Sequence, residues 1–523
     1  MPKAANRQPK ARLRPLTNKK TLYTSLSIGI TLLLVIIGGG LYFFVPKYAD
    51  NPNILPSIKA PEKVFNAKSY TLDNGLRVIV VENHIAPVVT HMVWYGVGAA
   101  DETAGKSGIA HFLEHLMFKG SEGLAPGEFS KTIRSLGGND NAFTSQDYTA
   151  FYQSIAAQHL EKIMRMEAGR MRGLNVPPEE VDSERLVILE ERRQRTDNDP
   201  QARFSEQLNA AAFINHPYGT PVIGWYNEME NLSWDDAKGF YDKWYAPNNA
   251  ILVVSGDVSG DEVYALAQSI YGVIPRVEVP TRNRTASPPL YAQTQITMHS
   301  AEIRQPEFQR LVRLPSYHQN AQDSLALQVL EEILGSGPTS RLYKSLVIEQ
   351  KIASSAGFSY RSEAWDDATG YLYATPTPGR SLEEVRDAID VELRRLIAEG
   401  ITASELKDAV SRMQTQAIYA RDSLTGPAMV IGSSLITGSD LNDVEYWPDN
   451  IAKVTAEQVR DVAQRFLDPD AKGEVRGVDG FLLPEGMPAP AEQRETAPAN
   501  EPATEVLEVP AVPVSDQMPE AAK

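Results

Sequence analysis

Residues 108–116 of this 523-residue chain read Gly-Ile-Ala-His-Phe-Leu-Glu-His-Leu, and this stretch decides how the rest of the sequence is interpreted. On an α-helix, His111 and His115 lie four residues apart, so both imidazoles share one face and can bind one metal ion. Glu114 is next to His115 and one turn from His111, where its carboxylate can hold a water molecule bound to that metal. The simpler alternative is a metal-free helix in which two histidines contact a nearby carboxylate.

The spacing His-x-x-Glu-His is the inverted form of a zinc-peptidase motif, in which the glutamate is the general base. Catalytic zinc usually keeps three protein ligands and one open, water-filled position. A third ligand is therefore needed, and it should be a carboxylate or imidazole on a different element.

The acidic segment 177–193 offers such a ligand. Two prolines open the segment and acids fill its first turn, which is typical of a helix N-terminus. Glu184 and Glu191 are two turns apart and share a face, whereas Glu190 points about 100° away from Glu191. If that face meets the histidines, Glu191 is the ligand, and Glu184 lies behind it, where it could orient the site or stabilise charge. Taken alone, the segment is better interpreted as a solvated acidic face.

Four stretches, in this order, together resemble the pitrilysin/insulinase family, which includes the mitochondrial processing peptidases and many bacterial zinc proteases. They are residues 71–78 (TLDNGLRV), 96–102 (GVGAADE), 108–120 (GIAHFLEHLMFKG) and 137–145 (GGNDNAFTS). The resemblance covers roughly residues 65–470 and is strongest in the first half. In the family, a segment like Glu-Arg-x-Val-x-x-Glu-Glu carries the third zinc ligand, which falls here on Glu191. An accessory glutamate one heptad earlier falls on Glu184.

The resemblance implies a zinc metalloendopeptidase with one Zn²⁺ per chain, acting on peptides or unfolded protein segments. His111, His115 and Glu191 would hold the zinc. Glu114 would take a proton from the bound water and later pass it to the leaving amine. Glu184 would be an accessory catalytic residue.

The resemblance also implies that substrate adds as an extended strand to a sheet edge beside the zinc, so that main-chain pairing gives affinity with little sequence preference. That edge is expected at Asn141, Ala142 and Phe143.

One departure from the family lies in the second half. Family members often carry an arginine and a tyrosine there that bind the substrate main chain, and these positions fall near Val347 and Ser354. Neither residue can do that, although a shifted alignment would bring in Tyr360 and Arg361. A homologous partner subunit that supplies the pair, as in heterodimeric family members, is the hypothesis that follows.

The predicted fold class is α+β, with two domains of helices packed on a mostly antiparallel sheet. The family implies that the two domains are homologous. Strands are expected at Leu76–Val81, Val88–Tyr95, 141–153, Asn249–Ser255 and Gln305–Leu314, and a periodic helix at Ala321–Leu334. The expected boundaries are a basic cytoplasmic N-terminus at 1–20, a transmembrane anchor at 21–46, a spacer at 47–64, a catalytic domain at 65–274, a linker at 275–294, a second, non-catalytic domain at 295–472 and a Pro/Ala/Glu-rich disordered tail at 473–523.

Residues 21–46 contain no charged side chain, and Leu22 to Val45 would measure about 36 Å as a helix, enough to span a bilayer with some tilt. Seven lysines and arginines precede the segment, so the positive-inside rule places the N-terminus in the cytoplasm. The expected location is the bacterial inner membrane, with the catalytic body in the periplasm. A cleaved signal peptide is the alternative.

The net charge is −16, and because the first twenty residues carry +7, the remaining chain carries −23. An acidic body argues against nucleic acid as a partner. The chain has no cysteine, which excludes disulfides and thiolate metal ligands. Two functions besides general peptide hydrolysis stay open: a dedicated precursor-processing peptidase and a non-catalytic scaffold or substrate-recognition subunit.

Overall fold

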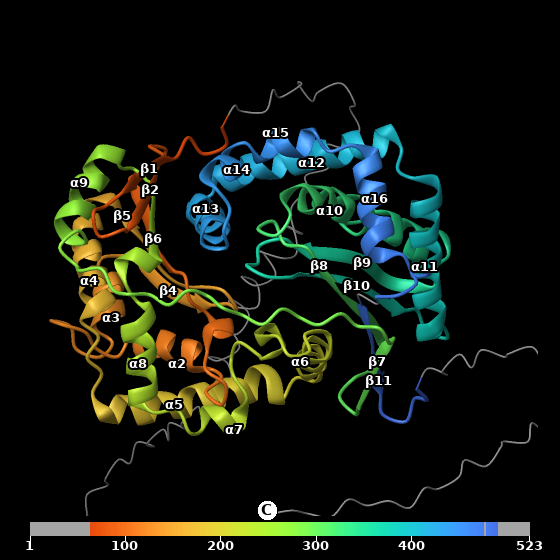
Figure 1. Ribbon diagram of the computed structural model, residues 1–523, viewed down its shortest axis with the longest axis horizontal. Coiled ribbons are helices and arrows are strands. Elements are labelled where there is room, and N and C mark those ends of the chain that lie inside the picture. Colours follow the sequence, from red (N-terminus) through yellow and green to blue (C-terminus); the bar gives the residue numbers. More distant parts are fainter. Residues whose placement is uncertain (1–62, 475–476, 490–523) are drawn as a thin grey trace, which may run out of the picture.

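The computed structural model describes residues 63–474 and 477–489, which form two halves joined by a linker, each with helices packed on a mixed, mostly antiparallel sheet (Figure 1). The predicted cytoplasmic segment, the transmembrane segment and most of the spacer and tail lie outside the described residues. Within the described ranges, no helix is both long and apolar enough to cross a membrane.

The first half is built on a six-stranded sheet with the strand order β1-β2-β6-β3-β5-β4. Its strands are β1 (Lys68–Thr71), β2 (Arg77–Glu82), β3 (Val88–Tyr95), β4 (Asn139–Thr144), β5 (Thr149–Ala156) and β6 (Ala250–Gly256). Only the β2–β6 pair is parallel. Its helices are α2 (Ile109–Leu116), α3 (Glu128–Ser135), α4 (Leu160–Arg172), α5 (Pro178–Arg192), α6 (Pro200–Ala212), α7 (Tyr226–Met229), α8 (Trp234–Trp244) and α9 (Gly260–Ile270). Alternate strand residues such as Val78, Val80 and Val93 form one core with α2, α3, α4, α8 and α9.

The second half repeats this topology in a five-stranded sheet with the order β7-β11-β8-β10-β9. Its strands are β7 (Thr294–Ser300), β8 (Glu307–Leu314), β9 (Ala353–Arg361), β10 (Ala368–Pro376) and β11 (Gly477–Pro484). Its helices are α10 (Ala321–Leu334), α11 (Leu382–Glu399), α12 (Ala403–Asp422), α13 (Gly426–Ile436), α14 (Leu441–Glu445), α15 (Trp447–Ala452) and α16 (Ala456–Leu467). The one parallel pair, β7–β11, matches β2–β6, and the remaining strands match in order and direction. The two halves therefore share one topology, as the resemblance implied.

Each half also covers a sheet face of the other. Helix α13, from the second half, packs on the face of the first sheet opposite α4 and α9, where Ile431 and Leu435 meet Met92 and Trp94. The approach is close, because a Cβ added at Gly432 would lie 2.0 Å from the Trp94 ring. Helix α6, from the first half, packs in turn on the second sheet beside β11 and β8. The halves are thus interlocked, which Figure 1 shows with α13 placed between them.

The structure confirms the predicted α+β class and corrects some boundaries. The strand expected at 141–153 is two strands, β4 and β5, because residues 145–148 form a tight turn. The tail expected from residue 473 is also wrong at its start: β11 lies inside the second sheet between β7 and β8. Its six central residues are all buried, so the second domain extends to Pro484.

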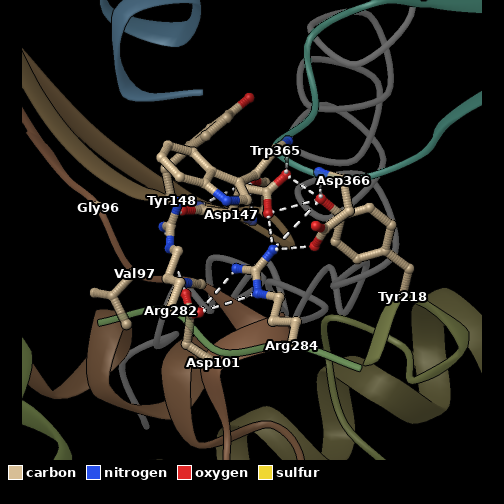
Figure 2. Close-up of polar contacts among 12 residues, drawn as sticks. Gly96, Val97, Asp101, Asp147, Tyr148, Tyr218, Arg282, Arg284, Trp365 and Asp366 are labelled. Atoms are coloured by element: carbon tan, nitrogen blue, oxygen red, sulfur yellow. Dashed lines mark hydrogen bonds and ion pairs between the residues drawn. The ribbon is translucent and has the colours of Figure 1, made fainter. Parts of the chain in front are cut away.

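The linker joins the halves through a buried cluster of charges (Figure 2). Arg284 from the linker contacts Asp101 at 2.8 Å and also pairs with Asp147, both from the first half. The same guanidinium lies 3.0 Å from Asp366, which follows β9 in the second half. The Tyr218 hydroxyl donates to Asp147 at 2.7 Å and completes the cluster. One arginine therefore holds carboxylates from both halves.

Candidate metal centre

Helix α2 begins at a sharp turn that only glycine fits. Gly108, the residue before the helix, has φ of 86°, and a Cβ there would lie 2.6 Å from the Ile223 carbonyl oxygen. Glu102 caps the helix, since its two carboxylate oxygens accept the backbone N–H groups of Gly108 and Ala110 at 3.0 and 2.9 Å. The helix is buried on nearly all sides, and this fixes the direction of its polar residues.

Helix α5 brings Glu191 to the two histidines of α2. The Oε2 atom of Glu191 lies 3.3 Å from His115 Nε2 and 3.8 Å from His111 Nε2. One ligand atom from each of these three residues lies within 4.8 Å of the others, and within the described residues this is the only such group. Two imidazole nitrogens and a carboxylate oxygen are a donor set that fits zinc and leaves its fourth position open.

Glu184 lies behind His115. Its Oε1 is 2.7 Å from His115 Nδ1, and its Oε2 is 2.5 Å from the Lys119 ammonium. Both oxygens of Glu184 are therefore engaged. Because Glu184 occupies His115 Nδ1, the nitrogen of this ring that can bind a metal is Nε2. A carboxylate behind a metal-binding histidine fixes the ring orientation and raises its basicity.

Glu114 is held by Thr144, the last residue of β4. The Thr144 hydroxyl donates to Glu114 Oε2 at 2.6 Å. Burial raises the pKa of Glu114 to about 7, against the opposing effect of this hydrogen bond. A carboxyl group with a pKa near neutrality is suited to taking up and releasing a proton.

The charges at the three ligand positions match a cation site. Burial, reinforced by His115, lowers the pKa of His111 to about 3, so that ring is neutral and free to bind. Burial disfavours charge on His115 and on Glu191, but their polar contacts prevail. Glu184 and then Glu191 raise the pKa of His115 to about 9, and the two histidines with Arg195 lower that of Glu191 to about 2.

The predicted substrate strand is β4, which among the described strands pairs only with β5 and lies at the end of the sheet. Asn141 is exposed, whereas Ala142 packs towards the main core and Phe143 packs edge-on to Trp94 at 5.4 Å between ring centres. Because Thr144 contacts Glu114, this edge strand ends beside the candidate base. The structure thus brings the expected substrate edge and the metal helix together.

The two positions where the family carries the arginine and the tyrosine have structural contacts in this chain. Val347 lies in the π-helical turn Tyr343–Glu349 and packs against the second core, and the hydroxyl of Ser354 faces the Thr375 carbonyl at 3.3 Å. The shifted alternative is wrong for Tyr360, because this residue is buried and its hydroxyl contacts Pro315 and Ser324. Arg361 is exposed at the end of β9.

Sequence reasoning missed three residues that hold the centre in place. Thr144 and Lys119 act across elements, so no local spacing pointed to them. Arg195 lies four residues after Glu191 and contacts its Oε1 at 2.6 Å. An acid followed by an arginine at this spacing is a known helix pair, and that signal was available in the sequence.

Comparisons with known proteins agree with this geometry. The profile of the insulinase family (peptidase family M16) matches residues 77–224, and that of the peptidase M16 inactive domain matches residues 231–413. A zinc protease named PqqE from Helicobacter pylori is 31% identical over 406 residues, 77% of this chain and 90% of that protein. An uncharacterised zinc protease of Mycobacterium leprae is 29% identical over 76% of this chain and 88% of its own length.

Solved structures show the same architecture. A protease from Helicobacter pylori superposes with a TM-score of 0.74 at 28% identity, covering 80% of this chain and 99% of the other. The first half of the periplasmic protease PqqL from Escherichia coli gives a TM-score of 0.67 at 21% identity over 81% of this chain and 93% of that one, a likeness of fold.

Proposed function

Because the chain belongs to the insulinase family of peptidases (family M16), we propose that it is a zinc-dependent metalloendopeptidase that cleaves peptides or unfolded protein segments. The observation that carries the proposal is the convergence of His111, His115 and Glu191 next to Glu114. The intact set of four argues against a purely non-catalytic scaffold.

The roles of the residues follow from their contacts. His111 Nε2, His115 Nε2 and Glu191 Oε2 would hold the zinc, which when bound would lower the pKa of a ligated water and polarise the scissile carbonyl. Glu114 has one oxygen occupied by Thr144. Its other oxygen would accept the proton of the attacking water and return it to the leaving amine.

Glu184 would act through His115 rather than on the substrate, since both its oxygens are engaged. Main-chain groups of β4, at Asn141, Ala142 and Phe143, would pair with the substrate as an added strand.

A partner subunit forms the next part of the proposal. Neither Val347 nor Ser354 can bind a substrate main chain as an arginine and a tyrosine would, and the Tyr360 hydroxyl is already engaged. We propose that a homologous chain supplies that pair in a heterodimer. Full peptidase activity of the zinc-loaded single chain would overturn this part and leave the catalytic proposal intact.

Residues 21–46 would anchor the enzyme in a bacterial inner membrane, with the body in the periplasm. The uncharged segment and the preceding lysines and arginines support this placement. Fusions of a periplasm-active reporter after residue 60 and after residue 20 test it: activity is expected only from the longer fusion, and activity from neither would contradict the topology.

The catalytic proposal is tested on the full-length chain in mild detergent, alone and with any co-purifying chain. A quenched, unstructured peptide should be cleaved by the native chain, and Glu114→Gln should lower the rate by about 10²–10⁴-fold while the bound zinc is retained. Cleavage unaffected by Glu114→Gln would contradict the proposal. Zinc binding with no cleavage of general peptides would point to a dedicated precursor-processing role.

A further inference from the structure

The two oxygens of Glu191 face different partners. Oε2 points to the paired imidazoles, at 3.3 and 3.8 Å from the two Nε2 atoms. Oε1 instead lies 2.6 Å from Nη1 of Arg195. The carboxylate therefore presents a single oxygen to the metal position.

Arg195 belongs to a π-helical turn, Arg193–Asp197, that continues directly from α5. Single π turns within helices are frequent at functional sites. Buried Arg192 directly precedes this turn and anchors it. Its guanidinium donates to Glu206 and to the Gly224 carbonyl at 2.9 and 2.7 Å. The backbone that carries Arg195 is thus fixed with respect to Glu191.

The same turn contains a second arginine, Arg193, whose ion pair can be compared with that of Arg195. Arg193 pairs with Glu190 on the outer face of α5, and its side chain is 51% exposed, the same fraction as that of Arg195. Glu190 is itself 48% exposed, whereas Glu191 is only 16% exposed. An ion pair between exposed groups is worth little, but a charge-assisted contact to a mostly buried carboxylate constrains its orientation.

We propose that Arg195 is a positioning residue that keeps Glu191 monodentate, with Oε2 on the metal and Oε1 withheld from it. The inference rests on the proposed zinc-peptidase function. Its consequence is that the fourth metal position stays free for water and the substrate carbonyl. Without Arg195, the carboxylate can rotate and bring both oxygens to the metal, which would occupy that position.

The test compares Arg195→Ala, Arg195→Lys and the control Arg193→Ala in the full-length chain, each loaded with Co²⁺ in place of zinc. Four-coordinate Co²⁺ absorbs visible light more strongly than five- or six-coordinate Co²⁺. Arg195→Ala should weaken the absorption band at full metal occupancy and lower kcat of the zinc form by about 10–100-fold, the usual cost of removing a partner of a metal ligand. Arg195→Lys should restore part of both signals, because it keeps the charge but not the planar fork.

The outcomes separate the two proposals. If the native chain binds Co²⁺ and Arg195→Ala leaves its spectrum like that of Arg193→Ala, the positioning role is overturned and the peptidase proposal stands. If the native chain binds no Co²⁺ at all, the metal centre itself is wrong and the role of Arg195 falls with it. Circular dichroism of each variant establishes that the fold is retained.

Discussion

At the residue scale, three glutamates surround the paired histidines, and the groups that hold their oxygens distinguish them. Both oxygens of Glu184 are engaged, by His115 and Lys119. Glu191 has one oxygen on Arg195. Glu114 has one oxygen on Thr144. Three identical side chains can therefore serve as support, ligand and base.

Thr144→Val should shift the activity profile to higher pH. The valine keeps the shape of the side chain but cannot donate to Glu114, so the pKa of that carboxyl rises further and the base is protonated over a wider range. A hydrogen bond to a charged group is worth about 1.5 kcal/mol, equivalent to about one pH unit. The acid limb of kcat/KM against pH should move up by about that amount.

Activity recovered above this limb would distinguish the effect from misfolding. An unchanged limb would mean that Thr144 does not act on the base.

Helical spacing places two pairs of residues of the centre, and the family resemblance was needed to choose the second pair. His111 and His115 share a face of α2, and Glu184 and Glu191 share a face of α5, as their spacing predicts. The contact of Thr144 with Glu114 joins β4 to α2 across the fold. A contact of this kind depends on tertiary packing, and local periodicity contains no signal for it.

At the element scale, helix α2 depends on a buried acid at its N-terminus. Burial raises the pKa of Glu102 to about 8, although the N–H groups of Ala110 and Gly108 favour its charged form. The folded chain thus binds this proton more tightly than the unfolded chain, whose glutamates titrate near 4.3. The stabilisation that this proton contributes is fully present below about pH 4.3 and is lost as the pH rises from there to about 8.

Glu102→Gln should therefore remove this contribution to the pH dependence of the folded chain's stability. The amide has one acceptor oxygen where the native residue uses two, so a constant loss of stability is expected. The Tm of the variant relative to the native chain should nevertheless increase steadily from pH 5 to pH 8 in thermal scans. A difference that stays constant with pH would contradict the assignment.

Elements with strong local signals were predicted closely. The observed bounds of β3 and α10 are the predicted ones, and β8 differs by two residues at its start. Strand β11 falls inside the stretch that the sequence analysis predicts to be a tail. Its place between β7 and β8 is set by pairing partners far away in sequence.

At the scale of the whole molecule, the halves are joined by α6, α13 and the charge cluster around Arg284 (Figure 2). The linker appeared in the sequence only as a Pro-, Arg- and Ser-rich connection. Neither its role at the centre of the cluster nor the exchange of helices could be predicted, because apolar helix faces do not specify which sheet they will cover.

Arg284→Ala should destabilise the chain by about 3–5 kcal/mol, because it leaves buried carboxylates without their shared cation. Denaturant unfolding measures the loss. Adding Asp366→Asn should recover part of it, since one of the unpaired charges is then removed. If the two effects simply add, within about 0.5 kcal/mol, Arg284 does not couple the halves through Asp366.

The central claim is that two histidines of α2 and one glutamate of α5 hold a catalytic zinc. Anomalous X-ray scattering at the zinc absorption edge, from crystals of the zinc-loaded chain, tests this most directly. The account predicts one zinc peak bound by His111 Nε2, His115 Nε2 and a single oxygen of Glu191, with Glu114 nearby but not ligating. A peak elsewhere, a zinc bound by Glu184, or no peak at these residues would contradict it.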